Sequence, residues 1–255
     1  MKYDRIFTFG CSWTRYVWPT WADIIRYASD APPVYNWGNP GIGNVGIFYK
    51  MVECDLKNKF TDRDLILVQW SSWTREDRYL NQWEAYGNVF NSHFYDNRFI
   101  RKYWSWNNHV IKNATSIISA NKMFNIGYQF NMLPFLDVES GGVPALESLH
   151  REFHDMYFEN LPNLDNFPNQ LNTDFNGNMG DGHPDIATHL FFFNNYIKDK
   201  FKFDLGHNEQ ALMELQNAIS KKVKPSLTYD QKQNIVFREI IKFDPKWNFE
   251  KEGLK

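Results

Sequence analysis

The sequence predicts an α/β domain in three layers, with a central, mainly parallel sheet between two layers of helices, followed by a C-terminal helical extension. Short strand-like segments alternate with helical stretches through the N-terminal half of the chain, a pattern typical of right-handed βαβ units. Residues 64–69 are apolar almost throughout, as in a strand buried on both faces of a parallel sheet. A chain of 255 residues is long enough for one large domain and an appendage.

The expected elements follow one another along the chain. A first strand at residues 5–9 ends at a glycine, and apolar residues with helical spacing predict a helix at residues 21–28. The next elements are a strand at 34–36, a helix at 45–56, the buried strand at 64–69, a helix at 99–120 and a strand at 124–130. Residues 159–182 are rich in Asn, Pro, Asp and Gly and predict a long loop, after which a helix is expected at 186–201.

The composition changes after Leu205. Two charged, amphipathic stretches at residues 209–222 and 229–242 predict helices. We therefore expect a main domain at residues 1–205 and an extension at residues 206–255, whose amphipathic helices suit self-association or docking in a larger assembly.

Charge and hydropathy exclude several classes of partner. The chain carries 28 Lys and Arg against 30 Asp and Glu, so its net charge of −2 gives no footprint for nucleic acid. No apolar run approaches the roughly 18–20 residues of a membrane span, and the N-terminus does not have the pattern of a signal peptide. With only Cys11 and Cys54 present, we expect a cytoplasmic protein, or one released or assembled without a signal peptide.

Two distant segments carry residue types that suit nucleophilic catalysis. Ser12 follows the first expected strand, and the carboxyl ends of strands are where open α/β sheets bind ligands. Its hydroxyl can act as a nucleophile if a base lies within hydrogen-bonding reach. His183, just before an expected helix, is the best candidate base, and Asp181 can orient the imidazole and stabilise the imidazolium.

In this order, the segments resemble the SGNH (GDSL-like) hydrolase family over about residues 4–203. Gly10-Cys-Ser-Trp-Thr14 is similar to the nucleophile block, with Cys11 in place of Asp, and Asn36-Trp-Gly-Asn-Pro-Gly41 is similar to the glycine block. Asp181-Gly-His183 is one residue shorter than the family's Asp-x-x-His. The third block departs further, because residues 68–75 contain no Asn where the family uses one in its oxyanion hole.

The resemblance implies a flavodoxin-like SGNH fold and a serine esterase that needs no cofactor. Ser12 would attack an ester carbonyl, His183 would take the serine proton and Asp181 would complete the triad. The backbone N–H groups of Ser12 and Gly41 would form the oxyanion hole, with Ser71, Ser72 or Arg75 replacing the missing Asn. Many members remove acetyl groups from sugars, so the implied substrate is a small acylated carbohydrate and the implied activity is O-deacetylation.

Aromatic residues make up 18% of the chain, and several lie near these blocks, where they can stack on a sugar. The candidate substrate-binding residues are Trp13, Asn44, Trp70, Trp73 and Arg75, and Trp18 and Trp37 are further candidates for the aromatic rim. Packing in the core is the alternative for each tryptophan.

Three other interpretations follow from the sequence. A thiol mechanism through Cys11 is disfavoured, because neighbouring residues at a strand end face opposite ways. The pair His150 and His154 lacks the zincin order His-Glu-x-x-His, so we expect no metal site. The missing Asn and the shortened last block allow a catalytically weak or inactive SGNH-like protein, which would be a glycan-binding or structural subunit of a larger assembly.

Overall fold

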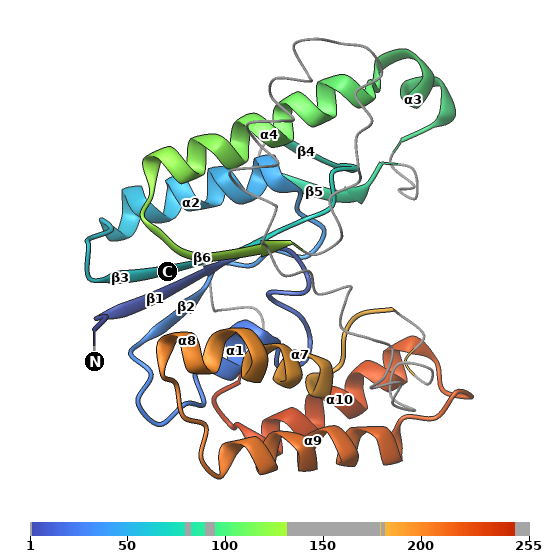
Figure 1. Cartoon of the computed structure of the whole chain (residues 1–255). Helices are drawn as coiled ribbons and strands as arrows, with labels where there is room; N and C mark the ends of the chain where they lie inside the picture. The colour runs from blue at the N-terminus through green and yellow to red at the C-terminus, as the bar shows by residue number, and fades with distance from the viewer. Residues whose placement is uncertain (1, 80–82, 90–94, 132–178, 180–181, 248–255) are drawn as a thin grey trace. The chain divides into compact units, whose positions relative to one another are not determined.

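The structure is a computed structural model that describes residues 2–79, 83–89, 95–131, 179 and 182–247. These residues contain a four-stranded, mainly parallel sheet with the strand order β2-β1-β3-β6 (Figure 1). The strands are β1 (Arg5–Phe9), β2 (Val34–Asn36), β3 (Asp64–Trp70) and β6 (Ile126–Asn131). The predicted α/β class is therefore confirmed, whereas the assignment to the SGNH fold stays a prediction.

The chain divides into two compact units whose segments interleave along the sequence. The described residues of the first unit are 2–8, 12–38, 179 and 182–247, and those of the second are 9–11, 39–79, 83–89 and 95–131. Ser12 and His183 thus belong to the same unit, although they come from distant parts of the chain. The proposed domain boundary after residue 205 stays a prediction.

The first unit combines a parallel strand pair with helices from both ends of the chain. β1 pairs with β2, and α1 (Trp21–Ile25), which is buried along its whole length, packs against α7 (Ile186–Phe192). A π-helical segment (Phe193–Lys198) and the short α8 (Asp199–Phe201) continue α7. The helix expected at 186–201 therefore changes its winding part-way along.

The helices predicted near the C-terminus are also present in the first unit. α9 (Asn208–Lys222) and α10 (Tyr229–Phe243) begin and end within one residue of the predicted bounds, and they pack against each other (Figure 1). A capping box starts α10, in which the Thr228 hydroxyl accepts from the backbone N–H of Gln231. α9 also packs against α7.

The second unit contains the pair β3 and β6, with α2 (Asn44–Asn58) and α4 (Trp106–Met123) packed together (Figure 1). Every residue of β3 is buried, as its apolar sequence predicts. The helix expected at 99–120 is two helices, α3 (Asn97–Tyr103) and α4. The chain is extended at Trp104, and Ser105 then caps α4 by accepting from the backbone N–H of Asn108.

An antiparallel hairpin in the second unit was not predicted. It consists of β4 (Arg75–Tyr79) and β5 (Trp83–Asn88), and the charged sequence of β4 gives no strand signal. The Asp77 carboxylate accepts from the backbone N–H groups of Gly43 and Gly46, both at 2.8 Å, so the hairpin is fastened to the N-terminus of α2. Within the described ranges, no helix has the length and apolar character needed to cross a membrane.

Candidate active-site residues

Ser12 lies in the loop that follows β1. The residue is 4% exposed, and its hydroxyl has no hydrogen-bond partner among the described residues. Ser12 and His183 are both described, and they do not form a hydrogen bond with each other. Hydrogen bonds between a nucleophile and its base are often long before substrate binds.

Two contacts connect the segment after Ser12 to His183. The Tyr16 ring stacks on the His183 imidazole, with ring centroids 4.0 Å apart and planes inclined by 15°. The indole N–H of Trp18 donates to the carbonyl oxygen of Pro184 at 2.9 Å. Because Tyr16 lies only four residues after Ser12, the stack fixes His183 beside the loop that carries the serine.

The residues that follow His183 have structural roles. Asp185 is fully buried and caps α7, since one carboxylate oxygen accepts from the backbone N–H and the hydroxyl of Thr188 at 2.8 and 2.7 Å. The other oxygen accepts from the Gln216 side-chain amide at 3.0 Å. Both oxygens of Asp185 therefore accept hydrogen bonds from α7 and α9. Asp181, the predicted third member of the triad, lies outside the described residues.

A second histidine lies close to His183. His189 on α7 is 1% exposed, and its Nδ1 has no hydrogen-bond partner in the described part of the chain. Burial, together with the charge of nearby His183, lowers the pKa of His189 to about 3. His189 is therefore neutral throughout the physiological range.

This burial gives the fold a pH dependence. His189 takes up a proton at a pH of about 6.5 in the unfolded chain but only near 3 in the folded one, so folding stability is lost as the pH falls from 6.5 towards 3. When the pH falls from 7 to 5, we expect the free energy of unfolding of the wild type to decrease by about 2 kcal/mol more than that of His189→Gln. Urea denaturation at the two pH values measures this difference. His207→Gln, at an exposed histidine, should retain the wild-type dependence. If the stability of the wild type and of His189→Gln changed equally with pH, His189 would not be the cause of the pH dependence.

A buried polar network shapes the loop between Ser12 and α1. Asp23, which is 3% exposed, accepts from the backbone N–H of Thr20 at 3.0 Å and from the side-chain amide of Asn36 at 3.0 Å. The same amide donates to the carbonyl oxygen of Thr14 at 2.8 Å, two residues after Ser12. Burial raises the pKa of Asp23, although its hydrogen bonds and Arg26 oppose the shift. The network thus fixes the loop backbone from α1 and from the end of β2.

The other predicted oxyanion-hole residues lie in the second unit. Gly41 has a φ of +79°, and its carbonyl oxygen accepts from the backbone N–H of Gly87 at 3.1 Å. The Ser71 hydroxyl is buried and has no partner within the described ranges, whereas the Ser72 hydroxyl shares a hydrogen bond with that of Thr74. Ser71 therefore retains a hydroxyl that can bond to a ligand or a water.

Two predicted substrate-binding residues, Asn44 and Arg75, make hydrogen bonds within the second unit. Asn44 is 1% exposed and accepts from the backbone N–H of Ser71 at 2.6 Å, while its NH₂ group donates to the Ser71 carbonyl and to Asn113. The Arg75 guanidinium donates to the carbonyl oxygen of Ile42 at 3.0 Å. Asn44 therefore joins α2, α4 and the end of β3, and its role in binding substrate stays a prediction.

The expected aromatic rim is largely absent from the surface. Trp18, Trp37, Trp70 and Trp73 are at most 6% exposed, and the Trp70 indole N–H donates to Gln129 on β6. These rings pack in the interior, where large aromatic side chains bury much apolar surface. Among the five predicted tryptophans, only Trp13, which is adjacent to Ser12 in the sequence, is half-buried rather than buried.

Three further residues with polar side chains were not selected from the sequence as candidates. Tyr16 and His189 flank His183, and the side-chain oxygen of Asn131 is buried without a partner among the described residues, at the carboxyl end of β6. Asn131 could have been selected from the sequence, because it directly follows an expected strand and ligands bind at the carboxyl ends of such strands. No residue pattern distinguishes Tyr16 from the other aromatic residues of its loop.

Comparisons with known proteins add no assignment. No protein-family model, no curated protein and no solved structure matches this chain. Among the described residues, no group of three or more His, Cys, Asp or Glu side chains is arranged to hold a metal ion.

Proposed function

We propose that the protein is a serine esterase in which Ser12 is the nucleophile and His183 is the general base. The observation that carries the proposal is the stack of Tyr16 on His183, which holds the candidate base beside the loop of the candidate nucleophile. The two residues come from distant parts of the sequence, yet they belong to one compact unit.

In the proposed reaction, the Ser12 oxygen forms a bond to the carbonyl carbon of an ester while His183 takes the serine proton. The backbone N–H of Ser12 donates to the developing oxyanion. His183 then protonates the leaving alcohol, and a water molecule activated by His183 hydrolyses the acyl-serine. Asp181 is proposed to orient His183, and neutral His189 leaves the positive charge of the intermediate on His183.

The proposed substrate is an O-acetylated carbohydrate, which follows from the family resemblance. Trp13 is the aromatic ring available next to Ser12 for stacking on a sugar. The burial of the other four tryptophans favours a small substrate that contacts few aromatic side chains.

A glycan-binding or structural role without catalysis is the second candidate. It is favoured by the low exposure of Ser12 and by the lack of a hydrogen bond from Ser12 to His183. Under this interpretation the Ser12 loop is a rigid part of the first unit, and α9 and α10 present the surface for an assembly partner.

A fluorophosphonate probe distinguishes the two functions. An activated serine attacks phosphorus, a P–O bond forms, the P–F bond breaks and fluoride leaves, while the serine proton passes to the histidine. We expect stoichiometric labelling of the wild-type protein, with the added mass on the peptide that contains Ser12. Labelling at a different residue, or none after prolonged exposure, would support the non-catalytic role.

A further inference from the structure

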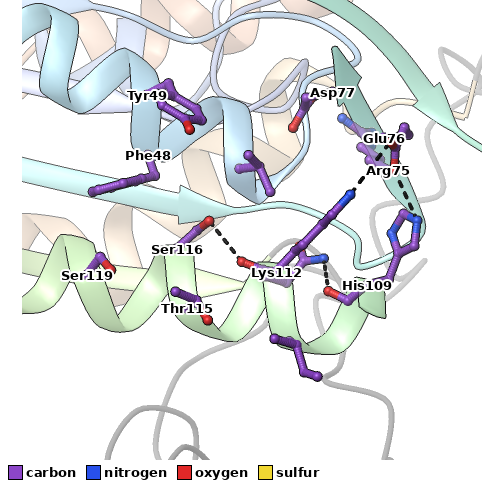
Figure 2. A pocket seen from close by; sticks show the side chains of 13 residues that line it. Phe48, Tyr49, Arg75, Glu76, Asp77, His109, Lys112, Thr115, Ser116 and Ser119 are labelled. Carbon is purple, nitrogen blue, oxygen red and sulfur yellow. Dashed lines mark hydrogen bonds and ion pairs between the residues drawn. The ribbon is translucent and has the colours of Figure 1, made fainter. Parts of the chain in front are cut away.

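The second unit contains an open groove that includes neither Ser12 nor His183. It has a volume of about 400 Å³ and lies between α2 and α4, with β4 at one end (Figure 2). This volume suits a small molecule. Its residues come from α2, β4 and α4.

The negative charges of the groove are already engaged. The Glu76 carboxylate contacts His109 Nε2 at 3.0 Å, Arg78 Nε at 3.8 Å and Lys112 Nζ at 4.0 Å. Burial opposes ionisation of Glu76, but the hydrogen bond from His109 and the charge of Lys112 hold its pKa below the usual range. Asp77 is committed to the backbone at the start of α2. A cationic ligand would therefore meet carboxylates that already have their partners.

Lys112 differs from the other charged groups of the groove. Its side chain is 47% exposed, and its ammonium has Glu76 as its one ionic partner among the described residues, at the 4.0 Å limit of an ion pair. Figure 2 shows this side chain extending from α4 towards Glu76. At least two of its three N–H donors are thus free to bond to a ligand.

The remaining walls offer hydroxyl groups and aromatic surface. Thr115 and Ser119 contribute hydroxyls from α4, and Phe48 and Tyr49 contribute rings from α2 (Figure 2). Tyr49 is 46% exposed, so part of its surface is open to a ligand. Aromatic rings and hydroxyls together suit a ligand with a hydroxylated ring.

We propose that this groove binds a small hydroxylated molecule that carries an oxyanion, either a carboxylate or a phosphate. The oxyanion accepts from the Lys112 ammonium, and the ring of the ligand lies between the α4 hydroxyls and Tyr49. The proposal does not depend on Ser12, because every residue that carries it belongs to the second unit.

Three sugars of matched size test the proposal by isothermal titration calorimetry on the full chain. Glucuronate carries a carboxylate, glucose 6-phosphate carries a phosphate, and glucose is the neutral reference. We expect at least one of the two anions to bind saturably and about tenfold or more tighter than glucose, because charge-assisted hydrogen bonds are the stronger ones. The anion that binds identifies the preferred group.

Variants of two lysines on α4 locate the binding site. Lys112→Gln should weaken binding of the preferred anion about tenfold or more, and Lys112→Glu should abolish it. Lys122→Gln, at an exposed lysine in the last turn of the same helix, should bind as the wild type does. Circular dichroism checks that each variant is folded. Equal affinity for glucose and the anions, no saturable binding, or unchanged binding in folded Lys112→Glu would each overturn the proposal.

Discussion

Replacing Ser12 by alanine is expected to lower the kcat for hydrolysis of p-nitrophenyl acetate at least about a thousandfold, because loss of a catalytic nucleophile leaves only the contribution of the remaining site. The backbone N–H of residue 12 is unaffected by this change, so the variant removes the hydroxyl alone. Since that hydroxyl has no partner among the described residues, its removal should not destabilise the fold.

Two control variants separate Ser12 from general effects. Ser226→Ala changes an exposed serine of the same unit and should leave kcat unchanged. Cys11→Ser tests the neighbouring thiol, which is fully buried, and should retain most of the activity. Turnover by Ser12→Ala at the wild-type rate would contradict the serine mechanism, and a selective loss in Cys11→Ser would transfer the role to the thiol.

Replacing Asp23 by alanine is expected to lower the free energy of unfolding by about 2–4 kcal/mol, because two buried donors lose their acceptor. These donors are the backbone N–H of Thr20 and one N–H of the Asn36 amide, and neither can be solvated without opening the loop. Urea denaturation at pH 7 measures the change.

The control for Asp23 is Asp199→Ala, which removes an exposed carboxylate in the same unit and should change stability by no more than about 0.5 kcal/mol. The loss of stability in Asp23→Asn should lie between those of Asp23→Ala and Asp199→Ala. The amide oxygen still accepts from one donor, while the NH₂ group faces the other donor. If Asp23→Ala unfolds within about 0.5 kcal/mol of the wild type, the network does not stabilise the fold.

Much of the fold could be predicted because its signals are local. The continuous apolar run of β3 and the amphipathic periods of α9 and α10 each identify one element without reference to the rest of the chain. The β4–β5 hairpin could not be predicted in this way. Its charged residues are used for long-range contacts, as when Asp77 binds the start of α2, and such contacts leave no periodic pattern.

The candidate site shows the same limit. Ser12 and His183 could be selected as catalytic residue types at strand and helix ends, whereas the roles of Asn44 and Asp185 depend on their partners. Asn44 has the chemistry of a substrate ligand, yet its amide is satisfied by Ser71 and Asn113. Tryptophans near a motif likewise show only that aromatic area is present, and burial decides whether it is used for packing or for recognition.

The interleaving of the two units bears on how the chain folds during synthesis. β1, β2 and α1 are synthesised early, but α7, against which α1 packs, is synthesised only after the whole second unit. Until then no helix covers the apolar surface of α1. This surface includes the Trp21 ring, which packs edge to face with Phe192 of α7 in the folded protein. Such high contact order slows folding and prolongs the exposure of aggregation-prone surface. The described residues of the second unit come almost entirely from one continuous stretch of chain, so we expect this unit to fold first and the first unit to be completed later.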